Sequence, residues 1–159
     1  MGLGELVGGG VPPTKTTMVT ADWQHHSFAL AYNAETFYMV GGNMDGSETS
    51  QVCKFQLNTE KQAIAGTKTV KVAAGELRVE IMPNNMATVR VNPGAAVCAG
   101  RLYVVGGQDE NGVALDSIEF LLLSNRKATW KAVAAKLAAP RASPVICKVG
   151  PTAVLIAGG

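Results

Sequence analysis

Short runs of hydrophobic residues occur in closely spaced pairs along the chain. The second run of each pair ends in two glycines: TFYMVGG at 36–42, RLYVVGG at 101–107 and AVLIAGG at 153–159. The run before each of these is also apolar: SFALAY at 27–32, GAAVCA at 94–99 and SPVICKV at 143–149. Turn-forming residues separate the two runs, so each pair predicts a β-hairpin. The hydrophobicity is continuous rather than alternating, which predicts strands that are covered on both faces.

More strands are predicted after the first two hairpins. A polar loop and a third apolar run follow each of them, at 51–57 and at 117–123. A fourth strand, ATWKAVA at 128–134, follows in the second unit, whereas strands near 67–73 and 76–82 take its place in the first. The glycine pairs begin at 41, 106 and 158, which gives intervals of 65 and 52 residues. Units of roughly 50 residues with four strands each are typical of β-propeller blades.

The pattern therefore predicts an all-β chain of four-stranded antiparallel blades that form an incomplete ring. A Gly-, Pro- and Thr-rich lead-in is expected at 1–20, a first blade with an insertion at 21–90, a second blade at 91–141 and the inner hairpin of a third at 142–159. A hairpin with an open, apolar edge is an aggregation hazard. We expect more of the same protein, or another chain, to complete it.

Composition narrows the functional classes. The chain has 14 basic and 12 acidic residues and a net charge of +2, which argues against a nucleic-acid or anionic-membrane partner. Hydrophobic runs stay below the roughly 18 residues that a membrane span needs. The N-terminus lacks the basic region and long apolar block of a secretory signal, so a cytoplasmic location is expected. Cys53, Cys98 and Cys147 lie in apolar runs without CxxC spacing, which favours free, buried thiols.

Candidate catalytic and binding chemistry is weak. The stretch at 8–17, GGGVPPTKTT, has some of the spacing of a phosphate-binding loop, but it lacks a glycine at position 14 and a preceding strand. His25 and His26 are adjacent, so in a strand they point to opposite faces and do not share a metal. They are expected to begin the first inner strand. The loop carboxylates could form an acid/base pair or a Ca²⁺ site, but ordinary turn chemistry is favoured. No catalytic residue, metal or cofactor is expected.

These features resemble the kelch repeat family, whose motif has an aromatic before a Gly-Gly pair, a later tryptophan and a Pro-Arg near the next blade. The second repeat matches best. Its matching residues are Tyr103, Gly106, Gly107, Trp130 and Pro140-Arg141. The first repeat has Tyr38, Gly41 and Gly42, and the third has Gly158 and Gly159. Tyr103 and Trp130 are expected to fill the wedge between adjacent blades.

The resemblance implies a non-catalytic scaffold for protein–protein interaction. Loops after the glycine pairs and between blades would then line one face, at Asn43, Asp45, Ser47, Glu48, Gln108, Asp109, Glu110, Asn111, Arg141 and Ser143. These loops are rich in acids, so a basic or polar peptide is the expected partner. The alternatives are a fragment of a propeller enzyme, either galactose oxidase-like or a sugar epimerase, and a structural subunit of a large assembly.

Overall fold

The described part of the protein is built from β-strands and turns. The structure is a computed structural model, and it describes residues 25–33, 36–58, 68–72 and 75–159. No helix that could span a membrane occurs among these residues. The expected lead-in at 1–20 and the loop-like stretch at 8–17 lie outside them.

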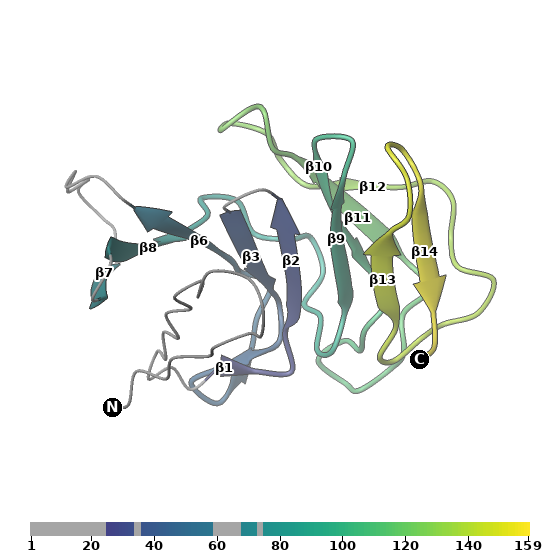
Figure 1. Cartoon of the computed structure of the whole chain (residues 1–159). Coiled ribbons are helices and arrows are strands. Elements are labelled where there is room, and N and C mark those ends of the chain that lie inside the picture. The colour runs from purple at the N-terminus through teal and green to yellow at the C-terminus, as the bar shows by residue number, and fades with distance from the viewer. Residues whose placement is uncertain (1–24, 34–35, 59–67, 73–74) are drawn as a thin grey trace, which may run out of the picture.

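Three sheets stand side by side and fan out from one line, as Figure 1 shows. The first has the strand order β2-β3-β6-β8-β7, the second β12-β11-β10-β9, and the third is the hairpin β13-β14. Their strands are β2 (Ala29–Asn33), β3 (Thr36–Val40), β6 (Val52–Asn58), β7 (Lys68–Val72), β8 (Gly75–Ile81), β9 (Gly94–Cys98), β10 (Arg101–Val105), β11 (Ile118–Leu122), β12 (Lys131–Ala132), β13 (Val145–Lys148) and β14 (Val154–Ala157). A small sheet of β1 (His25–His26), β4 (Asn43–Met44) and β5 (Ser47–Glu48) accompanies the first.

All pairings are antiparallel, and the three predicted hairpins form with equivalent registers. Ala29 lies opposite Val40 in the first, Gly94 opposite Val105 in the second and Val145 opposite Ala157 in the third. The first strands of the hairpins, β2, β9 and β13, are neighbours along the line from which the sheets radiate (Figure 1). This arrangement is that of consecutive blades in a partial β-propeller, and it confirms the predicted all-β fold class.

The first sheet has five strands because the insertion adds one. The strands expected near 67–73 and 76–82 are present as β7 and β8. β8 pairs along β6 and occupies the place of a fourth strand, and β7 pairs with β8 on the outside.

The core fills the spaces between neighbouring sheets. Side chains alternate along the strands, so Ala29 and Ala31 are buried between the first two sheets while Leu30 is exposed. That first core consists of Ala29, Ala31, Tyr38, Val40, Val52, Met86, Ala95, Val97, Leu102, Val104, Leu121 and Trp130. A second, smaller core lies between the second and third sheets and is built on Ala96, Val105 and Ile146.

Three sequence-based expectations need correction. His25 and His26 do not begin the inner strand, because Ser27 adopts a positive φ of 58° and breaks the strand between them and Ala29. They pair with β4 instead. The fourth strand expected at 128–134 is paired only at β12, and Trp130 precedes it with its side chain in the first core.

Cys147 is the third correction. All three cysteines are free thiols, and Cys53 and Cys98 are buried as expected, but Cys147 is exposed. It lies on the face of β13 that points away from the second sheet, and the described residues do not cover this face.

Thiol reactivity should separate these cysteines. Burial raises the pKa of the Cys53 thiol above 9.0, so its nucleophilic thiolate is scarce and shielded. A thiol reagent added to the folded chain at neutral pH is expected to modify Cys147 first and Cys53 only on unfolding. Peptide mass spectrometry over time measures the order. Modification of Cys53 at the rate of Cys147 would contradict the burial.

The same burial predicts a loss of stability at alkaline pH. The folded-state pKa values of Cys53 and Tyr38 both lie above their usual values of 9.0 and 10.0. The unfolded chain therefore loses these protons first, and the free energy of unfolding falls as pH rises from about 9 through the folded pKa values. Urea titrations at several pH values measure this fall. Cys53→Ala should make it shallower, and an unchanged slope would count against the contribution of Cys53.

Candidate functional site

The three glycine pairs lie at the same edge of the three sheets, the lower edge in Figure 1. We call this the glycine edge, and it is marked by Gly41, Gly42, Gly106, Gly107, Gly158 and Gly159. All six have positive φ, between 57° and 91°. Residues with a side chain adopt this left-handed conformation only at a cost. The repeated pair therefore gives the chain the same sharp bend at the end of each hairpin.

A segment that joins neighbouring blades passes close behind these glycines. A β-carbon added to Gly41 would lie 2.5 Å from the carbonyl oxygen of Arg90, and one added to Gly106 would lie 2.7 Å from that of Arg141. In the first two pairs, the second glycine bonds to the same carbonyl oxygen. The Gly42 amide donates to Arg90 O at 2.7 Å and the Gly107 amide to Arg141 O at 2.9 Å. The first and second glycine pairs thus each hold the start of the next blade by a backbone contact.

The buried Arg90 side chain connects several strands and loops of the second blade. Its guanidinium is fully buried and forms an ion pair with Glu119 at 2.8 Å. It also donates to the carbonyl oxygen of Gly106 at 2.7 Å and to both the hydroxyl and the carbonyl of Ser117. The other carboxylate oxygen of Glu119 accepts the Ala87 amide at 2.8 Å. A buried charge with this many partners fixes the positions of the groups around it.

We call the contact of a basic side chain with the carbonyl oxygen of the first glycine the clamp. The other two blades carry variants of this clamp. Arg141 Nη1 donates to the carbonyl oxygen of Gly158, as Arg90 does to that of Gly106. In the first blade His25 Nε2 occupies this place, 2.7 Å from the carbonyl oxygen of Gly41. By strand register, the position of Glu119 opposite Val104 corresponds to Cys53 opposite Met39. The first blade therefore has a histidine and a buried thiol where the second has an ion pair.

The predicted binding loops extend from the glycine edge. Asp45, Ser47, Glu48, Glu110 and Asn111 are exposed there, whereas Asn43 is half-buried in β4. The structure also brings Ser143 to this edge, because its backbone lies within 3.1 Å of a β-carbon placed on Gly159.

Three of the predicted residues have contacts within their own loops or blades. Asp109 Oδ1 accepts the backbone amides of Asn111 and Val113, both at 2.9 Å. Gln108 Nε2 donates to the carbonyl oxygen of Gly112, also at 2.9 Å. Arg141 is held by Gly158. These three side chains shape the loops, and the exposed carboxylates of Asp45, Glu48 and Glu110 face solvent beside them.

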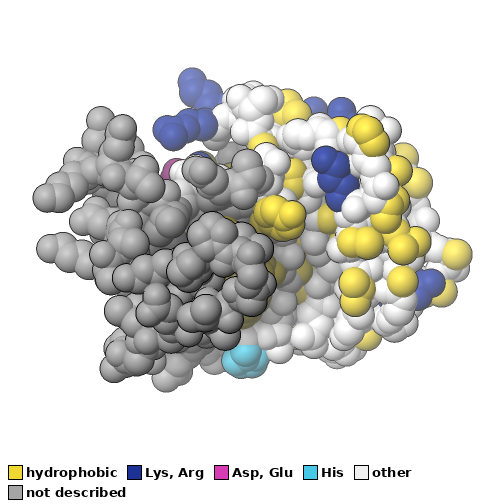
Figure 2. All heavy atoms as spheres, in the orientation of Figure 1, with side chains coloured by type: hydrophobic (Ala, Val, Ile, Leu, Met, Phe, Trp, Pro, Cys, Tyr) yellow, Lys and Arg dark blue, Asp and Glu magenta, His cyan; other side chains and the backbone are white. Residues whose placement is uncertain are grey.

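The two edges of the sheets carry opposite charge. Lys136 also lies near the glycine edge, but it forms an ion pair with Asp116 at 3.0 Å. Basic residues gather at the opposite edge, where Figure 2 shows several basic side chains along the upper part of the molecule. Those that the registers and turns place there are Arg101, Arg126, Lys127 and Lys148. Among the residues that the structure describes, the glycine edge is therefore mainly acidic and the opposite edge mainly basic.

Comparison with known families agrees with this geometry. Residues 90–134 match the family model described as the Kelch motif. Residues 90–134 therefore resemble a kelch repeat. The match begins at the clamp residue Arg90 and ends just after β12, so it covers the second blade of the structure. No curated protein matches the chain.

Trp130 closes the outer part of this kelch repeat. Its indole Nε1 donates to the carbonyl oxygen of Asn84 at 3.0 Å, and the Asn84 side chain donates to Ala128 O at 2.7 Å. Tyr103 lies on the other face of the second sheet, beside Phe120, with ring centroids 5.9 Å apart. Trp130 thus packs toward the first blade and Tyr103 toward the third.

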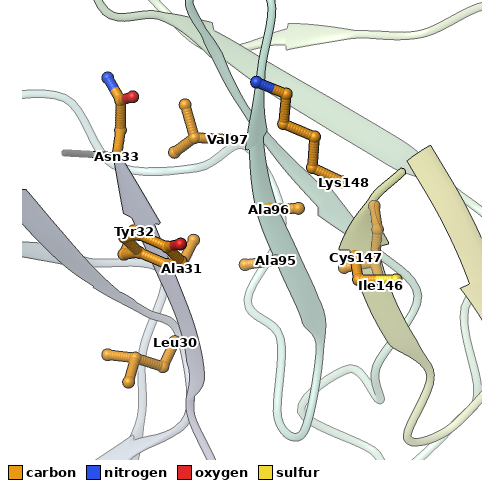
Figure 3. A pocket seen from close by; sticks show the side chains of 10 residues that line it. All are labelled: Leu30, Ala31, Tyr32, Asn33, Ala95, Ala96, Val97, Ile146, Cys147 and Lys148. Carbon is orange, nitrogen blue, oxygen red and sulfur yellow. The ribbon is translucent and has the colours of Figure 1, made fainter. Parts of the chain in front are cut away.

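A hollow of about 480 Å³ lies in front of the three inner strands β2, β9 and β13 (Figure 3). It is lined by Leu30, Ala31, Tyr32, Asn33, Ala95, Ala96, Val97, Ile146, Cys147 and Lys148. Most of these side chains are small and apolar, and of the lining residues only Lys148 is charged. No group of three His, Cys, Asp or Glu among the described residues is arranged to hold a metal ion.

Sequence reasoning missed Arg90, Glu119 and the role of His25. A signal was present, since RVNP at 90–93 recurs as RASP at 141–144, each just before an inner strand. The partner of Arg90 was harder to find. Glu119 lies in an apolar strand, and only the strand register brings its carboxylate to the guanidinium.

Two alanine substitutions should separate the two constraints that favour glycine, which are a positive φ and the close approach of another backbone segment. Gly46 has a φ of 85° but no atom within 4 Å of an added β-carbon, so Gly46→Ala is expected to cost about 1–2 kcal/mol of stability from backbone strain. Gly41→Ala adds a clash with Arg90 O, and overpacking contributes about 1–3 kcal/mol more. Urea unfolding measures the difference. Equal losses would mean that the close approach has no energetic role.

Breaking the buried ion pair should be far more damaging than breaking an exposed one. Removing one partner leaves the other charge buried and unpaired, so Arg90→Ala and Glu119→Ala are each expected to cost about 3–5 kcal/mol. Lys136→Ala is the control, because its side chain is 65% exposed and such pairs contribute about 0–1 kcal/mol. Chemical denaturation of the three variants gives the comparison. If the Arg90 and Glu119 variants lose less than about 1 kcal/mol in free energy of unfolding, the buried ion pair does not stabilise the blade as described.

Proposed function

We propose that the protein is a non-catalytic scaffold that binds another protein through the loops of its glycine edge. The observation that carries the proposal is the separation of charge between the two edges, with exposed carboxylates on the loops that the repeated glycine turns present.

The rigidity of the frame supports a binding role for these loops. Each loop leaves a bend whose backbone is held by the next blade, through the Gly42–Arg90 and Gly107–Arg141 hydrogen bonds. The second loop is braced further by Asp109, which accepts two of its backbone amides. Loops on a fixed scaffold lose little conformational entropy when they bind, and this favours recognition.

The chemistry of the edge favours a basic or polar peptide segment as the partner. Asp45, Glu48 and Glu110 offer exposed carboxylates, while the nearby cations Arg141 and Lys136 are engaged with Gly158 and Asp116. Complementary charge would steer a lysine- or arginine-bearing segment toward it.

The proposal predicts charge-dependent peptide binding. The chain would be used to select binders from a display library of random peptides, and affinities would be measured by calorimetry at low and high salt. We expect the selected peptides to be rich in Lys and Arg. Asp45→Asn, Glu48→Gln and Glu110→Gln together should weaken binding about tenfold or more, or about 1.4 kcal/mol. Added salt should weaken it in the same direction.

A matched control lies at the opposite edge. Arg126→Gln with Lys127→Gln changes exposed charges on the turn after β11 and should leave the affinity within about twofold. If no peptide is selected, or if the control variant loses binding while the carboxylate variant keeps it, the glycine edge is not the binding face. Unfolding measurements on both variants would check that the frame is intact.

A further inference from the structure

Asn111 and Gly112 lie in the loop that joins β10 and β11, at the lower edge in Figure 1. They form the only Asn-Gly pair in the sequence. Both residues are exposed, and Gly112 has a φ of 75°. A β-carbon added to Gly112 would meet nothing closer than Gln108 Nε2 at 4.0 Å, so the space beside the Gly112 backbone is open.

Other asparagines of the described chain lack this combination. Asn92 precedes a proline, which has no amide hydrogen. The side chain of Asn84 is engaged, because it donates to a backbone carbonyl oxygen at 2.7 Å. Asn125 is exposed in a turn, but Arg126 follows it and its Oδ1 accepts a backbone amide at 2.9 Å.

We propose that Asn111 deamidates spontaneously in the folded protein. The Gly112 nitrogen attacks the side-chain carbonyl carbon of Asn111, and a cyclic succinimide forms. The side-chain nitrogen takes up the proton that the Gly112 nitrogen loses, and it leaves as ammonia. Water then opens the ring at one of its two carbonyl carbons, which gives aspartate or isoaspartate. Glycine favours ring closure because it has no side chain and adopts many backbone conformations.

The turn around Asp109 restrains this reaction. The Gly112 amide donates to the carbonyl oxygen of Asp109 at 3.0 Å. Asp109 Oδ1 accepts the amides of Asn111 and Val113, both at 2.9 Å. The attacking nitrogen must lose the proton that it donates in this turn, and the backbone must rotate to bring that nitrogen to the side chain. The folded loop should therefore react more slowly than the same segment in an unfolded chain.

Deamidation would add a carboxylate to the glycine edge. Asn111 follows the exposed Glu110, and the loop of the first blade already has an exposed Asp45-Gly46 pair. The aspartate product would give the second loop an Asp-Gly pair like that of the first, and isoaspartate carries the same charge on a lengthened backbone. The consequence for recognition rests on the proposed function, because the added charge would attract the same basic segment.

Mass spectrometry of the folded chain during incubation in mildly alkaline buffer tests the reaction directly. One tryptic peptide, which follows Arg101 and ends at Arg126, contains both Asn111 and Asn125, so its fragment ions give an internal comparison. The Asn-to-Asp mass increase should arise about tenfold faster at Asn111, which corresponds to about 1.4 kcal/mol in activation free energy. Equal rates at the two positions, or an unmodified Asn111, would overturn the proposal.

Asn111→Gln is the matched control for the chemistry. Glutamine keeps the amide group, but its longer side chain would have to close a larger ring. The release of ammonia from the incubated protein should therefore fall in this variant. Ammonia release that stays at the wild-type rate would mean that it comes from other positions.

Asp109→Ala tests the restraint by the turn. The variant removes the carboxylate that holds two amides of the loop, so Asn111 should deamidate about threefold faster or more. The wild-type chain in urea gives a second measurement, because unfolding releases the same hydrogen bonds. If neither the variant nor the unfolded chain reacts faster than the folded wild type, the turn does not restrain the reaction.

The Asn111→Asp variant tests the consequence for recognition, since it has the charge of the aspartate product from the start. Its affinity for the selected basic peptides should be about two- to threefold higher than that of the wild type. If no peptide is selected, the proposed function fails, while the mass spectra still decide the modification. If the peptides bind the variant no more tightly, the added charge has no part in recognition.

Discussion

The structure depends on a close backbone contact between each of the first two glycine pairs and the segment that starts the next blade. A strand that ends in two residues of positive φ leaves room for a passing carbonyl oxygen, and that oxygen accepts the amide of the second glycine. This contact sets where one blade ends and the next begins. In the second blade the buried Arg90–Glu119 ion pair adds a side-chain hydrogen bond to the carbonyl oxygen of Gly106. The same contact places all the following loops at one edge.

In the three blades, different side chains contact the carbonyl oxygen of the first glycine in the pair. Arg90 satisfies the carbonyl oxygen of Gly106 as part of a buried ion pair, and Arg141 reaches that of Gly158. His25 reaches that of Gly41, and Cys53 rather than a carboxylate lies at the opposing position. The first blade thus lacks the buried ion pair of the second and has fewer hydrogen bonds to fix the geometry at this position. The glycine pair with positive φ is common to the three blades, and the backbone contact is the same in the first two although their side chains differ.

The proposed partner site is separate from the cores that hold the blades together. It is the glycine edge, at the ends of the strands, whereas the two cores lie between neighbouring sheets. Changes to the exposed loop carboxylates should therefore leave the packing between the sheets intact.

The sequence by itself determined the three hairpins, the third strands and the repeated glycine turn, because these depend on local hydrophobic runs and on backbone conformations that only glycine adopts readily. The resemblance to kelch repeats implied that the loops share one face. The tertiary structure alone decided which side chains meet across blades. Glu119 reads as one residue in an apolar strand until register brings it to Arg90, and Cys147 reads as buried until its face proves to be uncovered. Contacts between residues distant in sequence depend on how the sheets stack, and periodicity along one strand carries no information about that.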